Sequence, residues 1–246
     1  MGLFDWLRGG KTLYFPGKFT IDKLPEIYQN YLEILKILGV DFITLDNLGD
    51  SGMSYIHDGD WKNARLIALK NYEIFKKNKV DRIITNSPDC YRMFLEFYPK
   101  FIRDFNIKVE HVAVTVFNSL QRMGATSIER NSIKEVVTYK DSCYLGRLFG
   151  IYEEPRTVIE TLGGKIIEFE KNRENSVCSG ACGGVYENFP EIARASAIKT
   201  VSKIPREANK IICLSDVGYS NLKDVSEKAT EFSTFVLGKL KEVKNF

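Results

Sequence analysis

The chain's strongest candidates for a chemical role are four cysteines in its second half. They are Cys143, Cys178, Cys182 and Cys213, and a fifth cysteine, Cys90, lies in the first half. Thiolates are soft, anionic and strongly electron-donating, which is why they hold iron–sulfur clusters and structural zinc. Four thiolates match the ligand count of a 4Fe-4S or 2Fe-2S cluster and of a closed zinc site. We therefore take Cys143, Cys178, Cys182 and Cys213 as the candidate cofactor-binding and metal-ligating set.

A structural role is the alternative for each cysteine, because free cysteines are common in protein cores. Cys213 ends an apolar strand, where a shift of one residue reverses the face on which a side chain lies. We interpret Cys90 as a small buried hydrophobe at a helix start rather than a reactive thiol. An odd number of cysteines without a secretion signal argues against a disulfide framework and predicts a reducing, cytoplasmic location.

Composition excludes several functional classes. The chain has 246 residues, of which 35 are basic and 32 acidic, so nothing indicates nucleic acid as a partner. No apolar run approaches the roughly 18 residues needed to cross a bilayer, so we expect no transmembrane segment. The N-terminal residues Met1–Arg8 lack the features of a signal peptide, and we interpret them as a loose end or a short amphipathic foot.

Short apolar segments alternate with amphipathic ones along the whole chain. Strands are expected at residues 12–15, 41–45, 82–85, 109–116 (running into a helix), 135–139, 165–169 and 210–214. Helices are expected at residues 25–38, 61–75, 91–95, 155–162, 191–201 and 223–243. This alternation predicts an α/β fold with parallel sheets covered by helices on both faces. In such a fold, the loops that follow the strands gather at one edge and form binding sites.

The alternation restarts midway, which predicts a duplicated unit. Each half has three strand-end loops in the same order, and 35 residues separate the second loop from the third in both halves: from Ser51 to Ser87, and from Ser179 to Ser215. The gaps between the first two loops, 31 and 34 residues, also agree closely. We therefore predict two pseudo-symmetric strand–helix repeats, residues 1–125 and 126–246.

The loops also carry specific motifs. These are the opening Tyr14-Phe15-Pro16-Gly17, the run Asp141-Ser142-Cys143-Tyr144-Leu145-Gly146-Arg147, the residues Tyr152, Pro155 and Arg156, and the glycine-rich tail with Gly180, Gly183 and Gly184. In order and spacing, from about Leu13 to Leu237, they resemble the CCG-domain (cysteine-rich domain) family. That family includes heterodisulfide reductase catalytic subunits and related iron–sulfur oxidoreductase subunits, and its signature is Cys, Cys-Cys-Gly and Cys-Pro-x-Cys, twice per chain.

The resemblance implies tandem CCG-type domains in which each motif set would supply cysteines to a 4Fe-4S cluster. It implies an oxidoreductase subunit, heterodisulfide reductase-like if active, that works in electron transfer or thiol–disulfide redox chemistry. Partners would be other redox subunits that contain flavin or iron–sulfur clusters.

The chain departs from the family pattern mainly in its first half. The family's cysteine positions correspond there to Lys18, Asp50, Ser51, Ser87 and Cys90, and in the second half to Cys143, Cys178, Ser179, Ser215 and Gly218. Cys182 and Cys213 are cysteines that the family pattern does not require. These gains beside losses favour one rearranged cluster in the second half, with zinc as the alternative. Whether the replaced first-half residues form a new polar site is open.

Two other functions stay open. The chain could be a cluster-free scaffold or regulatory subunit of a redox complex, or a zinc-stabilised fold with a small-molecule site between its lobes. His57 and His111 are interpreted as structural histidines, and Arg147 and Arg156 as salt-bridge residues rather than substrate ligands.

Overall fold

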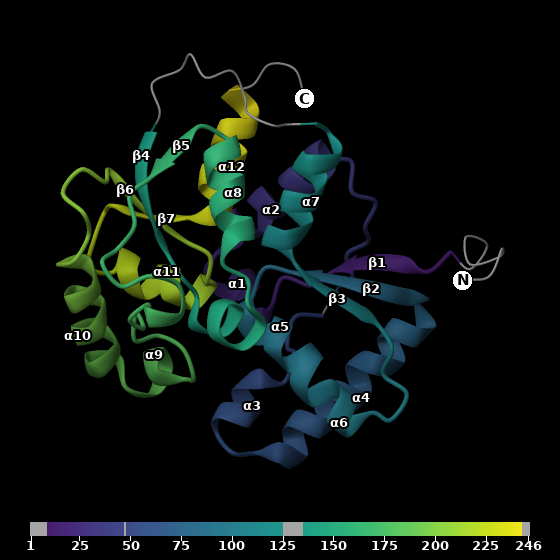
Figure 1. The fold of residues 1–246 in the computed structure, drawn as a ribbon. Helices are drawn as coiled ribbons and strands as arrows, with labels where there is room; N and C mark the ends of the chain where they lie inside the picture. The colour runs from purple at the N-terminus through teal and green to yellow at the C-terminus, as the bar shows by residue number, and fades with distance from the viewer. Residues whose placement is uncertain (1–8, 47, 125–134, 243–246) are drawn as a thin grey trace.

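The computed structural model describes residues 9–46, 48–124 and 135–242 (Figure 1). The N-terminal segment Met1–Arg8 and the predicted boundary between residues 125 and 126 lie outside these ranges. Strands and helices alternate in both halves, which confirms the predicted α/β class.

The first half runs from β1 to α7. Its elements are β1 (Lys11–Tyr14), α1 (Lys18–Lys23), α2 (Pro25–Ile37), α3 (Met53–His57), α4 (Trp61–Lys77), β2 (Val80–Thr85), α5 (Pro88–Arg92), η2 (Met93–Phe97), α6 (Tyr98–Phe101), β3 (Lys108–His111) and α7 (Val112–Arg122). The second half comprises β4 (Glu135–Lys140), η3 (Tyr144–Leu148), α8 (Glu153–Thr161), β5 (Gly164–Ile166), η4 (Arg173–Asn175), α9 (Val185–Asn188), α10 (Pro190–Val201), β6 (Lys210–Cys213), α11 (Asp216–Lys223), β7 (Ala229–Glu231) and α12 (Phe232–Glu242).

Local chemistry explains where several helices begin. Pro25 and Pro190 open α2 and α10, positions where the missing backbone N–H costs no helical hydrogen bond. At α4 the Asp60 carboxylate accepts a hydrogen bond from the Asn63 backbone N–H at 3.0 Å. At α11 the Ser215 hydroxyl accepts one from the Gly218 N–H at 3.2 Å. Such side-chain caps satisfy donors that the first helical turn leaves free.

The two sheets have the same topology. One has the order β1-β2-β3 and the other β5-β4-β6-β7, and all the strand pairs in both are parallel. Ile43 forms a single parallel bridge with Leu13 on the free side of β1. With Ile43 counted as the counterpart of β5, the strand order is the same in both halves. The structure thus confirms the predicted duplication.

Three predicted elements differ from the structure. Residues 41–45 make only the Ile43 bridge, because β1 is four residues long and offers few partners on that side. The strand predicted at 165–169 ends at Ile166. The Ile167 N–H still donates to the Val137 carbonyl at 2.8 Å, and Glu168 then binds the Arg156 guanidinium. The single helix predicted at 223–243 is wrong. The Ser226 hydroxyl accepts the Lys228 N–H at 3.2 Å in a turn, and β7 then pairs with β6 before α12 begins.

The two halves share one hydrophobic core. Helix α7 packs on α8, and α12 packs on α2, so each half places its last helix against the first long helix of the other (Figure 1). Residues from both halves join in this core, among them Tyr14, Ile34, Val116, Val137, Ile159 and Val236. No helix in the described ranges is long and apolar enough to span a membrane.

A buried polar contact also joins the halves. The Tyr31 hydroxyl on α2 donates a 2.6 Å hydrogen bond to the Glu231 carboxyl at the end of β7. The other carboxyl oxygen of Glu231 accepts from the backbone N–H of Ser233 at 2.6 Å. Burial raises the pKa of Glu231 from its ordinary 4.5 to about 7, because desolvation disfavours the charged form.

This carboxyl predicts how stability depends on pH. The unfolded chain releases the Glu231 proton above pH 4.5 while the folded chain keeps it to about pH 7, so stability falls as pH rises through this window. The loss attributable to Glu231 is about 3 kcal/mol. We expect Glu231→Gln to flatten this part of the profile, measured by urea unfolding at pH 5 and pH 8. The exposed Glu227→Gln is the control, and an equal profile in both variants would contradict the assignment.

Candidate metal centre

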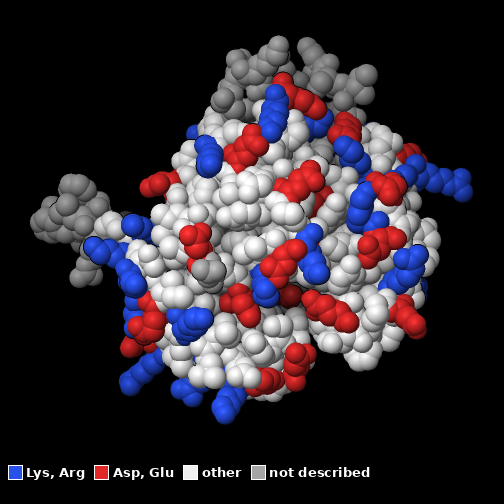
Figure 2. Space-filling model, turned by 180° about the vertical axis from the view of Figure 1, so that it is seen from behind, with Lys and Arg blue, Asp and Glu red and all other residues white. Residues whose placement is uncertain are grey.

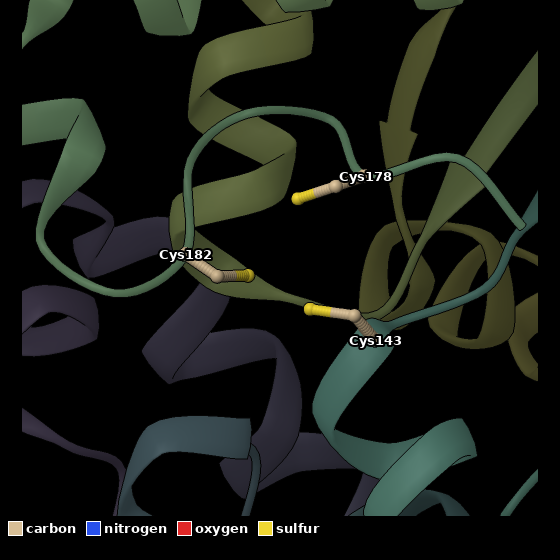
Figure 3. A group of neighbouring side chains, drawn as sticks. All are labelled: Cys143, Cys178 and Cys182. Atoms are coloured by element: carbon tan, nitrogen blue, oxygen red, sulfur yellow. The ribbon is translucent and has the colours of Figure 1, made fainter.

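Three of the four predicted cysteines converge at the carboxyl edge of the second sheet. The Sγ atoms of Cys143, Cys178 and Cys182 all lie within 4.8 Å of one another. Figure 3 shows the three side chains pointing into a common space from two loops. Cys143 follows β4 and immediately precedes η3, whereas Cys178 and Cys182 lie on the long connection between β5 and α9.

The loop that carries Cys178 and Cys182 depends on glycine. Gly180 has a φ of 86°, and a Cβ there would lie 2.4 Å from the Cβ of Ser196, so no other residue fits. The Gly180 N–H donates to the Cys178 sulfur at 3.3 Å. Asn221 on α11 also binds this loop: its side-chain amide donates to the Ser179 carbonyl at 2.7 Å. These contacts within the protein hold the loop in place.

A buried ion pair fixes the Cys143 loop. The Arg156 guanidinium donates to both carboxylate oxygens of Asp141, at 2.7 and 2.9 Å, and both side chains are almost fully buried. The same guanidinium binds Glu168 at 2.6 Å. The Asp141 carboxylate also accepts the Arg173 backbone N–H at 2.8 Å, which connects the Cys143 loop to the segment leading to Cys178. The salt-bridge role predicted for Arg156 is confirmed.

A buried lysine lies beside the thiols. Lys140 is 8% exposed, and its ammonium donates to the Asp141 carbonyl at 3.1 Å and to the Ser176 hydroxyl at 2.9 Å. Burial lowers its pKa, and the negative charges of Asp141 and Cys178 oppose that shift. Sequence reasoning missed Lys140. A lysine that directly follows the apolar run of β4 was the available signal, because a strand end is where such a side chain turns inward.

The three thiols differ in acidity. Hydrogen bonds from Cys143 and then Cys182 lower the pKa of Cys178 well below the ordinary value for a thiol. Hydrogen bonding to its neighbours raises the pKa of Cys182 and that of Cys143. A metal would release the remaining protons.

Cys213 lies apart from this group of three. It is 2% exposed, its Sγ donates weakly to the Ile211 carbonyl at 3.6 Å, and it packs in a small core with Phe169 and Leu222. Burial raises its pKa to about 12. It also lines a cavity of about 20 Å³ together with the other three cysteines and Ser142. The Ser142 hydroxyl is buried and has no hydrogen-bond partner among the described residues.

The equivalent positions of the first half form a different kind of site. Lys18, Asp50, Ser51, Ser87 and Cys90 all line a cavity of about 720 Å³. Cys90 is 4% exposed, and burial raises its pKa to about 12, which confirms that it is a buried structural cysteine. The replaced residues therefore line one open cavity.

The other residues considered from the sequence are His111, His57 and Arg147. His111 is fully buried; its Nε2 lies 3.1 Å from the Asn86 carbonyl, and its Nδ1 accepts the Ala113 N–H, as expected for a structural histidine. His57 lines the large cavity, with its Nε2 4.0 Å from the Asp89 carboxylate. Arg147 is exposed and makes no ion pair in the part of the chain that the structure covers, so its predicted salt bridge is absent there.

Comparison with known proteins matches these two sites to one family. A model of the cysteine-rich domain, CCG, matches residues 13–95 and again residues 137–218. The first match contains the cavity-lining positions of the first half, and the second contains all four cysteines of the second half.

Several curated relatives are iron–sulfur or redox proteins by name. The chain is 33% identical over 65% of its length to the probable iron-sulfur-binding oxidoreductase FadF of Bacillus subtilis, covering 22% of that protein. It is 29% identical over 66% of its length to EtfAB:quinone oxidoreductase of Syntrophomonas wolfei, covering 22% of it. It is 28% identical over 67% of its length to one subunit of the dihydromethanophenazine:CoB–CoM heterodisulfide reductase of Methanosarcina acetivorans, covering 41% of it. The chain therefore spans less than half the length of these relatives.

The Arg156–Asp141 pair predicts a large stability effect. Arg156→Met leaves the Asp141 carboxylate buried without its counter-charge, which typically costs about 3–5 kcal/mol. The matched control is Arg173→Met, whose side chain is 36% exposed and pairs with Glu153, so its loss should cost about 1 kcal/mol or less. Urea unfolding of the two variants measures the difference. Equal costs would show that the buried pair does not anchor the Cys143 loop.

Proposed function

The chain belongs to the cysteine-rich (CCG) domain family, and from this premise we propose that it is an iron–sulfur redox subunit with one modified cluster in its second half. The convergence of Cys143, Cys178 and Cys182 carries this proposal, because the three sulfurs lie within 4.8 Å of one another at a family motif position. Cys182 supports it in particular. Cys182 is not part of the family pattern, yet the loop places its sulfur beside those of Cys143 and Cys178, which are.

The donor set fits an iron–sulfur cluster. Cys143, Cys178 and Cys182 would supply three thiolates, and Cys213 is proposed as the fourth because it lines the same small cavity. The unpartnered Ser142 hydroxyl supplies a hydrogen-bond donor beside them, and the Lys140 ammonium supplies a positive charge. When bound, a cluster of this kind transfers single electrons. The protein's part is to orient the thiolates, exclude water and balance their charge.

The relatives' names guide the proposed partners. Two of them are named EtfAB:quinone oxidoreductase and a subunit of a heterodisulfide reductase. By analogy, we propose that this chain works with another redox subunit that contains flavin or iron–sulfur clusters. All five cysteines are free, which supports a reducing location such as the cytoplasm.

Zinc is the second candidate, and the spacing of the three sulfurs is compatible with it. Thiolates around a tetrahedral zinc ion are about 3.8 Å apart, given a Zn–S length of about 2.3 Å. The observed sulfur separations, all within 4.8 Å, are compatible with that spacing. A structural zinc ion would leave the chain as a redox-inactive member of its family.

Metal content tests the proposed function directly. We expect protein purified without oxygen to contain iron and acid-labile sulfide in equal amounts and to absorb broadly in the blue. Cys182→Ala should lose most of both, whereas Cys90→Ala should keep them, because Cys90 lies in the first half. Zinc in place of iron would select the structural alternative. No metal at all would favour the cluster-free scaffold.

A separate comparison tests the fourth ligand. Cys213→Ser keeps the size of the side chain but replaces the soft thiolate, so it should lower iron content or change the absorption spectrum. Cys213→Val keeps an apolar group in the core but cannot bind metal, so it separates the effect of losing a ligand from the effect of disturbed packing. If both variants load iron as the natural chain does, Cys213 is a core residue and the metal has three cysteine ligands.

A further inference from the structure

A large cavity lies between the two halves. It has a volume of about 720 Å³, within the range of small-molecule sites in proteins. Its walls come from α1, α3 and α5 of the first half and from α9 and α11 of the second. Figure 2 shows the molecule from behind, with a notch between two lobes and both acidic and basic side chains around it.

This space is the first-half counterpart of the cysteine centre. Where the second half brings three sulfurs together, the first half has Lys18, Asp50 and Cys90 around an open volume. Gly17 allows close packing at the inner end of the cavity, because a Cβ there would lie 3.0 Å from both the Cys90 Sγ and the Ser87 Cβ. The lost cluster ligands have therefore left a built cavity rather than a collapsed one.

A buried carboxyl group faces this cavity without a counter-charge. Asp216 is 3% exposed, and its oxygens accept hydrogen bonds from the Thr20 hydroxyl at 3.1 Å and the Val217 N–H at 2.9 Å. It forms no ion pair with any residue that the structure describes. The equivalent position in the first half is Pro88, so the fold does not require an acid there. These two hydrogen bonds give Asp216 a structural role, but burying a carboxylate without a counter-charge remains costly.

Neighbouring charges make the cavity more negative. Six carboxyl groups line it against three lysines: Asp22, Asp50, Asp89, Glu187, Asp216 and Asp224 against Lys18, Lys23 and Lys223. Lys18 pairs with Asp22, one of these six carboxylates, and Lys223 pairs with Glu227 outside the cavity, so five carboxyl groups remain against Lys23. Burial and the charge of Asp89 raise the pKa of Asp216 to about 7, and burial and Glu187 raise the pKa of Asp89 to about 6. A cation in the cavity would favour the charged form of both carboxyl groups and so lower both pKa values.

We propose that this cavity binds a small organic cation, an aliphatic amine whose ammonium group pairs with Asp89 and Asp216. The apolar part of the ligand has a place to pack, because the rings of Phe19 and Tyr186 meet edge to face at 6.0 Å in the wall. Aromatic faces also attract ammonium groups. A metal ion suits the cavity less well, because only the three cysteines of the second half form a metal-binding group among the described residues.

Isothermal titration calorimetry on the full chain tests this proposal with 1,4-diaminobutane as the probe. The matched neutral control is 1,4-butanediol, which has the same chain length without charge. Asp216→Asn keeps the size and the capping acceptor of the side chain but removes its charge, so folding should survive. Glu73→Gln, an exposed substitution on α4 outside the cavity, is the variant control.

We expect saturable binding of the diamine to the natural chain and to Glu73→Gln, none of the diol, and an affinity roughly tenfold or more weaker for Asp216→Asn. Asp89→Asn should weaken binding as well. Equal affinity in Asp216→Asn and the natural chain would overturn the proposal, as would the absence of binding at millimolar diamine. Magnesium binding in place of amine binding would also overturn it. The variants leave all the cysteines unchanged, so metal content measured on the same samples separates failure of this proposal from failure of the proposed function.

Discussion

The structure depends on one packing constraint, the exchange of helices between the halves. Because α7 lies on α8 and α12 lies on α2, the two sheets share a core and are held in one orientation. Parallel strands bring their following loops to one edge of a sheet. The helix exchange turns those two edges toward each other, so that Tyr144 of the second half reaches His57 of the first at 3.5 Å. Both candidate sites lie at this meeting of edges.

The same scaffold supports two kinds of chemistry because single positions decide what a loop presents. At the first loop, Cys143 supplies a soft donor where Lys18 supplies an exposed ammonium. At the third loop, Pro88 opens a helix where Asp216 buries a carboxyl group. The backbone is retained in each case: Gly52 and Gly180 have positive φ values of 92° and 86° at equivalent points. Divergence has changed side chains while leaving the loop geometry in place.

The sequence predicted the repeat and the approach of three of the four cysteines, because both depend on spacing. Equal intervals between Ser51 and Ser87 and between Ser179 and Ser215 require equal numbers of elements, and the structure has them. Side-chain direction was harder to predict. Whether Cys213 faces the centre or the core depends on one residue of strand register, and the end of β6 turns it mostly inward. The carboxyl end of the chain was misread, because Ala229–Glu231 is too short a strand to break a helical pattern. The burial of Lys140 and Asp216 depends on contacts between distant segments, which periodicity does not report.

The exchanged helices have one more consequence. The α7–α8 and α12–α2 contacts are the same contact made twice about a pseudo-two-fold axis, which is the arrangement of an isologous interface in a symmetric dimer. In a dimer of identical copies, every substitution appears on both sides of the axis, and two equal sites are unavoidable. Joining the two copies in one chain removes that restriction. A thiol can be lost on one side and gained on the other, and the symmetry of the backbone becomes compatible with asymmetric chemistry.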